Sequence, residues 1–90
     1  MAGLRNNTEL SRFELDEQGH TAYADYRRTD DRLIIDYVES PPPLRGAGTA
    51  GRLMTAIAEE ARLEGLKIVP ICGYAAAWLR RSKDYRDLLA

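Results

Sequence analysis

Apolar and polar residues alternate with a period of two along three stretches of the first 40 residues, "ELSRFELDE", "HTAYADYRR" and "RLIIDYVES". This period places successive side chains on opposite faces of a β-strand. The residues that share one face are Ser11, Phe13 and Leu15 in the first stretch, Ala22, Ala24 and Tyr26 in the second, and Leu33, Ile35 and Tyr37 in the third. Turn-forming residues, 18–19 and 29–31, join the stretches. The pattern predicts a three-stranded antiparallel meander, preceded by a flexible leader over residues 1–8.

The period changes to that of a helix at Gly48 and remains helical until Gly65, a natural C-terminal stop. The apolar positions of this stretch form one stripe: Ala50, Leu53, Met54, Ile57, Ala58 and Ala61. The next stretch, "LKIVPIC", predicts a short strand, in which Pro70 indicates a sheet edge or a bulge. "YAAAWLRRSKDYRDLL" predicts a second helix, broken near Ser82. The predicted order is β-β-β-α-β-α, in which the strand-helix-strand unit forms a right-handed crossover.

This order predicts a single domain over residues 9–90 of the α/β (α+β) class, with a mixed, mostly antiparallel sheet. The chain has 90 residues and a net charge of -1, which gives no basic excess for binding nucleic acid or a membrane surface. No apolar run reaches the roughly 20 residues of a bilayer span. The polar start lacks the features of a signal peptide, so a cytoplasmic location is expected. The one cysteine, Cys72, cannot form an internal disulfide.

The stretch "ESPPPLRGAGTAGRLM", residues 39–54, has a composition suited to binding an anion. A helix N-terminus presents unpaired N–H groups, and glycines let the backbone approach a phosphate closely. Arg45 adds a fork of donors that suits phosphate. No lysine follows the glycines, so the stretch is not a P-loop, and it follows an antiparallel meander rather than the first strand of a dinucleotide-binding unit. A plain strand-to-helix turn remains the alternative.

Residues 45–50, "RGAGTA", match the Gln/Arg-x-x-Gly-x-Gly/Ala signature of the GNAT N-acetyltransferase superfamily, which this stretch resembles. The similarity extends over residues 9–89, and it is to the minimal single-domain branch with a cysteine after its last core strand. It implies a small GNAT-like fold, with a splayed strand before the signature, that uses acetyl-CoA as co-substrate and no metal. It also implies which residues contact CoA: the backbone of Val38 and Ser40 along the pantetheine arm, and the amides of Arg45, Gly46, Ala47, Gly48, Thr49 and Ala50 around the pyrophosphate.

The chain departs from the branch at Tyr37, where a histidine is usual, and at Lys83, where a proline is frequent. Acetyl transfer needs a neutral amine, a donor to the thioester carbonyl and a proton for the leaving thiolate. The backbone N–H near Val38 is the expected carbonyl donor. Glu39 and Tyr37 are expected at the strand end, where a base is useful. Cys72 is expected as an acetyl carrier or a neighbour of the CoA thiol, and Tyr74 as the acid, with Tyr85 as the alternative acid.

Each of these residues has a plainer interpretation. Glu39 is then a solvated carboxylate, Cys72 a small buried residue and Tyr74 a packing aromatic. The only histidine, His20, fits a solvated turn, and the basic residues 80–83 either reach the 3′-phosphate of CoA or form a solvated helix face.

The sequence therefore predicts an N-acetyltransferase that transfers acetyl from acetyl-CoA to an amine, either a small molecule or a protein lysine. Transfer proceeds through a ternary complex or an acetyl-cysteine. A CoA-binding module with little catalysis is the alternative, and an interaction domain with a plain turn is a third. The predicted assembly is a monomer or a weak homodimer, with no nucleic-acid or membrane partner.

Overall fold

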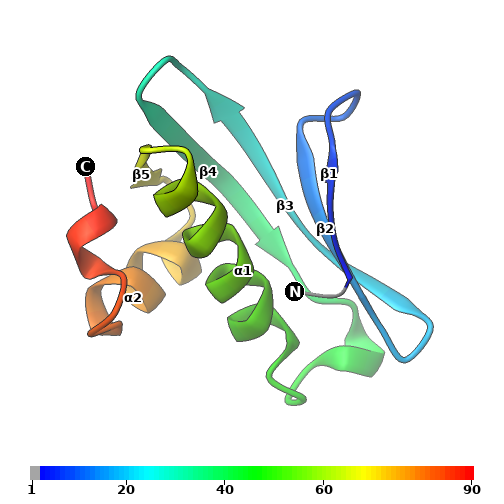
Figure 1. The fold of residues 1–90 in the computed structure, drawn as a ribbon. Helices are drawn as coiled ribbons and strands as arrows, with labels where there is room; N and C mark the ends of the chain where they lie inside the picture. The colour runs from blue at the N-terminus through cyan, green and yellow to red at the C-terminus, as the bar shows by residue number, and fades with distance from the viewer. Residues whose placement is uncertain (1–2) are drawn as a thin grey trace.

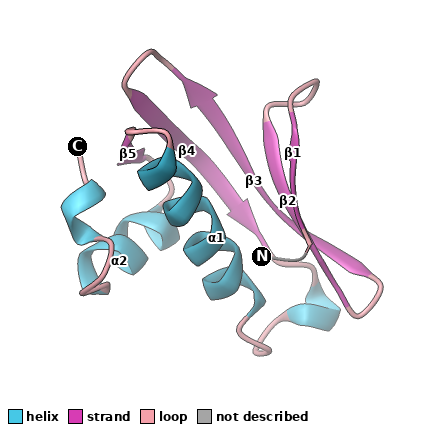
Figure 2. Cartoon of the chain, in the orientation of Figure 1, coloured by secondary structure: helices cyan, strands magenta, loops and turns pink. Residues whose placement is uncertain are grey.

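The computed structural model describes residues 3–90 as a five-stranded sheet with two α-helices (Figures 1 and 2). The elements are β1 (Leu4–Asn7), β2 (Arg12–Glu17), β3 (His20–Arg28), β4 (Arg32–Glu39), α1 (Thr49–Leu63), β5 (Lys67–Pro70) and α2 (Gly73–Arg81), with short 3-10 turns η1 (Pro42–Leu44) and η2 (Arg86–Leu88). The strands lie in chain order across the sheet; β4 and β5 are parallel and the other neighbours antiparallel. The mixed α/β class is confirmed, and the predicted element order is confirmed from β2 onward.

The core lies between the sheet and the apolar stripes of the helices, with α1 crossing the sheet in Figure 1. The predicted stripe of α1 is buried except at Ala50, which is half-buried. From the strands, the core receives Phe13, Leu15, Ala22, Ala24, Tyr26, Leu33, Ile35 and Ile68. Ala75 and Leu79 of α2 join the same cluster, so both helices share one core with the sheet. In residues 3–90 no helix is long and apolar enough to cross a membrane.

A strand occupies most of the segment that the sequence predicted as a flexible leader. Leu4–Asn7 form β1, which pairs antiparallel with β2 along its whole length. Leu4 packs against the core, and Arg5 forms ion pairs with Glu14 and Asp16 on the neighbouring strand. No alternation of apolar and polar residues marks this strand, because Leu4 is the only apolar residue of β1. Residues 1 and 2 of the predicted leader lie outside the described residues.

A bulge in β4 corrects the predicted face of Tyr37. Tyr26 lies opposite Ile35 and Asp25 opposite Tyr37, so Asp36 is an extra residue in β4. One extra residue reverses the inward and outward order of every later side chain. Tyr37 is therefore 47% exposed instead of sharing the core face of Ile35, and Val38 packs against the core in its place.

The end of β4 has a free edge toward β5. Their pairing begins at Arg32 opposite Lys67 and stops at Ile35 opposite Pro70, where proline has no N–H to continue the ladder. The chain then turns away into α2, and the amides of Ile71 and Cys72 donate to the Ile35 carbonyl. Within residues 3–90, the part of β4 beyond Ile35 has no partner strand on this side. This is the predicted splayed strand, and β5 is the edge strand that Pro70 indicated.

The predicted helix ends are also confirmed. Gly65, with φ 71°, follows α1, and the amide of Leu66 donates back to the Ala61 carbonyl. Helix α2 ends at Arg81, and Ser82 is its C-terminal cap. A loop and η2 complete the chain, so the second predicted helix is broken where the sequence indicated.

Candidate functional site

The loop between β4 and α1 is shaped by prolines and two left-handed glycines. Pro41 is extended and caps the turn η1. Gly46 and Gly48 then have φ values of 82° and 83°, a conformation that favours glycine. Gly48 is also the N-cap of α1, and no side chain caps the helix there. The loop therefore brings bare backbone to the start of a 15-residue helix.

Some of the loop amides are used within the loop and others are free. The Arg45 amide donates to the Pro42 carbonyl at 3.2 Å, and the Ala47 amide donates to the Leu44 carbonyl at 3.1 Å. In the loop and the first turn of α1, the amides of Gly46, Gly48, Thr49, Ala50 and Gly51 have no hydrogen-bond partner among residues 3–90. These free donors lie at the positive end of the α1 dipole, which makes the loop suited to an anion.

The free amides lie around a surface cavity of about 350 Å³, called the loop cavity below. Its lining comprises Ser40, Leu44, Arg45, Gly46, Gly48, Thr49, Ala50, Gly51 and Tyr74. Most of the residues predicted to contact CoA are thus brought together with one predicted catalytic residue, Tyr74. Val38 and Ala47 lie outside the lining, as do Tyr37, Glu39 and Cys72.

Ser40 contributes a polar atom that lacks a partner. Its Oγ is buried and has no hydrogen bond to any of the described residues. Buried hydroxyls in proteins are nearly always hydrogen-bonded, so an exception in the lining of a cavity indicates a place for a polar ligand. Ser40 also receives a bond from Arg45, whose Nε donates to the Ser40 carbonyl at 2.9 Å.

Arg45 joins the loop to two predicted catalytic residues at the end of β4. Its Nη2 donates to Glu39 Oε2 at 2.9 Å, and the Tyr37 hydroxyl donates to Glu39 Oε1 at 2.5 Å. The Tyr37 hydroxyl and then the Arg45 guanidinium lower the pKa of Glu39, while Glu39 raises the pKa of Tyr37. Glu39 is therefore a stable carboxylate at neutral pH and a weak base.

Tyr74 and Cys72 lie at the start of α2, and Tyr74 lines the loop cavity from there. Tyr74 is 40% exposed, and burial raises its pKa, so its hydroxyl keeps its proton at neutral pH. A Cβ added to Gly51 of α1 would lie 3.9 Å from the Tyr74 hydroxyl. The absence of a side chain at Gly51 therefore lets α1 and α2 approach each other closely here. Cys72 is the N-cap of α2 and is half-buried against the core.

Sequence reasoning missed a clamp that holds the loop to the β2–β3 hairpin. Glu17, at the end of β2, accepts hydrogen bonds from Thr49 Oγ1 and Arg52 Nε, both at 2.6 Å. Arg52 Nη2 also donates to the Ala47 carbonyl at 2.8 Å. Arg52 and Thr49 lower the pKa of Glu17 to about 2. No local signal marks these partners, because at least 32 residues separate them in sequence.

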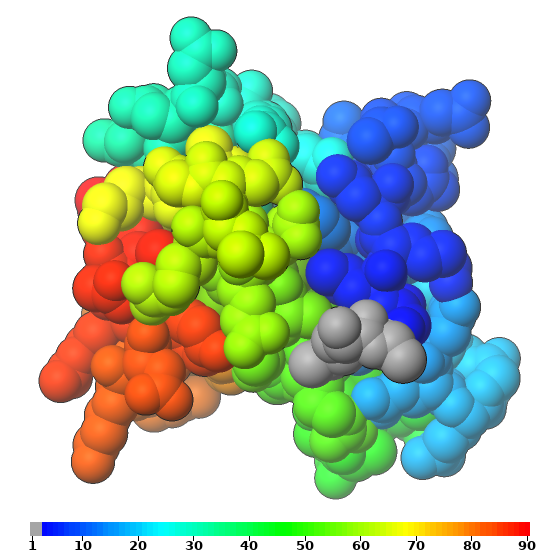
Figure 3. All heavy atoms as spheres, viewed as in Figure 1, coloured from blue at the N-terminus to red at the C-terminus, as the bar shows by residue number. Residues whose placement is uncertain are grey.

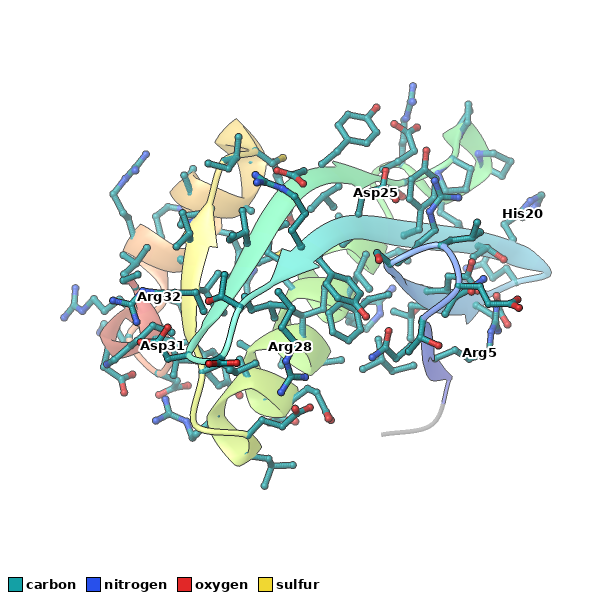
Figure 4. The ribbon with its side chains drawn as sticks, turned by 90° about the horizontal axis from the view of Figure 1, so that it is seen from above. Arg5, His20, Asp25, Arg28, Asp31 and Arg32 are labelled. Carbon is teal, nitrogen blue, oxygen red and sulfur yellow. The ribbon has the colours of Figure 1, made fainter. Side chains whose placement is uncertain are left out.

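His20 follows the clamped Glu17 at the tip of the hairpin and is exposed there, as Figure 4 shows. Within residues 3–90, no three histidine, cysteine or acidic side chains gather closely enough to hold a metal ion. The candidate site therefore consists of the loop, the free edge of β4 and the start of α2.

Comparison with known proteins agrees with this geometry. Residues 12–88 match the family model described as GCN5-related N-acetyl-transferase. A solution NMR structure of a GCN5-like candidate N-acetyltransferase from Staphylococcus aureus is 26% identical, with a TM-score of 0.67. The match covers 100% of this chain and 91% of that one. No curated protein matches the chain.

Proposed function

This chain belongs to the GCN5-related N-acetyltransferase family, and we propose that it transfers the acetyl group of acetyl-CoA to an amine. The observation that carries the proposal is the set of free amides at Gly46, Gly48, Thr49 and Ala50, which lie around a cavity next to a free strand edge. Acetyl-CoA supplies an activated acyl group as a thioester. The chain's own residues must then bind the diphosphate and align the thioester. They must also allow the amine to lose a proton and supply a proton to the leaving thiolate.

The loop is the proposed diphosphate site. Backbone amides at a helix N-terminus bind phosphate oxygens with no side-chain charge. Because the Arg45 and Ala47 amides are used within the loop, we assign the cradle to the free amides alone. The buried Ser40 hydroxyl supplies a further hydrogen bond. Val38 lies in the part of β4 that has no partner strand on the β5 side, which we assign to the pantetheine path. The residues present therefore fit a CoA ligand.

Two groups are proposed to act on the thioester. The backbone N–H near Val38 donates to the carbonyl oxygen, where negative charge develops in the transition state. The Tyr74 hydroxyl gives its proton to the leaving thiolate, and the raised pKa keeps that proton in place until it is needed. We propose direct transfer within a ternary complex, because Cys72 does not line the loop cavity, and an acetyl-cysteine at Cys72 remains the alternative route.

Glu39 and Tyr37 form the proposed acceptor side. The lowered pKa makes Glu39 a poor base, so we assign it the attraction and orientation of a protonated amine. The amine loses one proton to water before it attacks and a second when the amide forms, and that second proton restores the Tyr74 hydroxyl. The acceptor is a small amine or a protein lysine. The weak basicity of Glu39 is also the observation that favours the second candidate function, a CoA-binding module with little turnover.

Two measurements test the proposal. The first is the thermal shift caused by acetyl-CoA in wild type, Gly48→Glu and Gly65→Glu. Ligand at about 100 times its Kd stabilises a protein by about 2.7 kcal/mol, so a shift of at least several degrees is expected in wild type. Both glycines have left-handed φ values, but Gly65 follows the far end of α1. Gly48→Glu should lose the shift, and Gly65→Glu should keep it.

The second measurement is release of free CoA thiol from acetyl-CoA in the presence of small amines and lysine peptides. Release that depends on an amine supports acetyl transfer. Binding without release on any acceptor supports the binding module. Absence of both a thermal shift and thiol release overturns the proposed function.

A further inference from the structure

The solvent-facing side of α1 carries one bulky apolar side chain, Leu63, in its last turn. Leu63 is 83% exposed, more than any other large apolar residue among residues 3–90. A single exposed leucine is ordinary in a protein surface, so its surroundings decide whether it has a role. In Figure 3, α1, coloured green to yellow, faces the viewer between the blue strand β1 and the red C-terminal segment. Nothing in the proposed acetyl transfer uses this face.

Two surface cavities meet at Leu63. The first has a volume of about 310 Å³ and is lined by Glu59, Arg62, Leu63 and Tyr85. The second has a volume of about 210 Å³ and is lined by Leu4, Ala56, Glu59, Glu60 and Leu63. Because Glu59 and Leu63 line both cavities, the two form one surface, called the α1 surface below.

The first cavity has an aromatic wall that is held in place. The Tyr85 ring stacks on Trp78 with 5.8 Å between the ring centroids, and the Tyr85 hydroxyl donates to Glu59 Oε2 at 2.9 Å. Arg62 Cζ lies 5.7 Å from the centroid of the same ring. An apolar side chain can therefore enter the cavity between Tyr85 and Leu63 with little further ordering of the wall, which favours an anchor residue of a partner.

The cations near the α1 surface are already neutralised. Arg62 pairs with Asp87 at 2.9 Å, and Arg28 of β3 pairs with Glu64 at 2.6 Å. Each of these arginines thus has a carboxylate of its own.

The carboxylates of the α1 surface are not neutralised in the same way. Glu59 and Glu60 form no ion pair with any of the described residues. The neighbouring Glu64 and then burial raise the pKa of Glu60, because a second carboxylate lies beside it. The α1 surface therefore combines an apolar anchor site with uncompensated negative charge, and a partner with positive charge complements it.

We propose that the α1 surface docks a partner protein through a basic segment that carries a bulky apolar side chain. The apolar side chain enters the cavity between Leu63 and Tyr85, and lysines or arginines beside it face Glu59 and Glu60. Nucleic acid and anionic membranes fit this surface poorly, because their phosphates are repelled by the same carboxylates.

The α1 surface is remote from the loop cavity. From Thr49 to Leu63 the helix rises about 21 Å. A partner on the α1 surface therefore leaves the signature loop open, and the inference does not depend on the proposed function.

The probe is a fluorescein-labelled helical peptide of leucine and lysine in equal numbers, and its binding is followed by fluorescence anisotropy at low ionic strength. Wild type should bind this lysine peptide with a Kd in the micromolar range. It should bind a peptide with glutamate in place of lysine at least about tenfold more weakly. Saturating acetyl-CoA should leave the Kd of the lysine peptide unchanged.

Two surface variants and two matched controls locate the binding. Leu63→Asn should weaken binding of the lysine peptide roughly tenfold through lost apolar contact, and the double variant Glu59→Gln, Glu60→Gln roughly fivefold. Leu10→Asn removes a leucine that is 59% exposed and lies outside both cavities.

The charge control is the double variant Glu9→Gln, Asp30→Asn. It removes two exposed carboxylates that form no ion pair with the described residues and lie outside both cavities. Both controls should change the Kd by less than about twofold.

Binding of the lysine peptide weaker than about 1 mM overturns the docking surface, as does binding that Leu63→Asn leaves unchanged. Equal weakening by the two charge variants also overturns it, because general attraction to acidic groups then explains the binding. Binding of wild type to neutral phosphatidylcholine vesicles but not to the peptide would assign the surface to lipid and overturn the proposal. The thermal shift with acetyl-CoA tests the proposed function separately, and it should be the same in all four variants.

Discussion

Replacement of Gly48 by alanine tests how the signature loop is held. Gly48 has φ 83° and ψ 7°, and an L-residue in the left-handed conformation costs about 1–2 kcal/mol. The new Cβ would also lie 3.0 Å from Arg52 Nη1, a separation that real Cβ atoms tolerate only if the neighbour moves. Arg52 would have to shift, and its bonds to Glu17 and to the Ala47 carbonyl would weaken.

The matched control is Gly65→Ala. Gly65 has φ 71° and open space around the position of a Cβ, so it carries the backbone cost alone. For a domain of this size, a loss of 1 kcal/mol lowers Tm by about 4–8 °C. Gly65→Ala should therefore lower Tm by roughly 5–15 °C, and Gly48→Ala should lower it further. The measurement is thermal unfolding followed by circular dichroism at neutral pH.

The additional loss of Tm in Gly48→Ala should come from the weakened bonds between Arg52 and Glu17. It should therefore disappear in a variant that already lacks the Glu17 carboxylate. In a Glu17→Gln background, Gly48→Ala and Gly65→Ala should lower Tm by similar amounts, as a double-mutant cycle would show. Equal effects of the two glycine substitutions in the wild-type background would refute this reasoning. A difference that persists fully without the Glu17 carboxylate would also refute it.

Three further predictions concern single side chains. Glu17→Gln should lower Tm by a constant amount above pH 5 and by less at lower pH. The pKa of Glu17 is lowered to about 2, so its carboxylate contributes its full stability above the ordinary carboxyl pKa of about 4.3 and loses that contribution as the pH falls toward 2. A Tm difference that grows in acid would contradict this. Ser40→Ala should leave Tm unchanged or slightly higher while the Kd of CoA rises roughly fivefold, since the lost hydroxyl has no partner among the described residues. Tyr74→Phe should lower kcat by about 100-fold with little change in the Kd of CoA, and an unchanged kcat would exclude Tyr74 as the acid.

The long periodic elements and the signature loop could be predicted from sequence because their signals are local. The alternation at Phe13 and Leu15 and the stripe of α1 each arise within a single element. Gly65 and Pro70 marked a helix end and a sheet edge through backbone chemistry that does not depend on distant residues. The loop was recognisable for the same reason, since glycines followed by a helix suffice to predict free amides.

The features that escaped sequence reasoning depend on partners elsewhere in the chain. Strand β1 contains a single apolar residue and is defined by its ladder with β2. The bulge at Asp36 depends on how β4 pairs with β3, and it turns the side chain of Tyr37 away from the core. The clamp joins Glu17 to Thr49, which lies 32 residues later in the sequence. The amides of Arg45 and Ala47, both expected to bind the diphosphate, instead form hydrogen bonds within the loop.

Binding of acetyl-CoA at the signature loop is tested most directly by a map of backbone amide shifts in the ¹⁵N-labelled protein during titration with acetyl-CoA. We expect the largest shifts at the amides of Gly46, Gly48, Thr49 and Ala50, and smaller shifts at Val38 and at the start of α2. If acetyl-CoA leaves the loop amides unperturbed, or if the largest shifts lie on another surface, the loop is only a turn. The central claim, that this chain binds its acyl donor at the α1 N-terminus, would then be wrong.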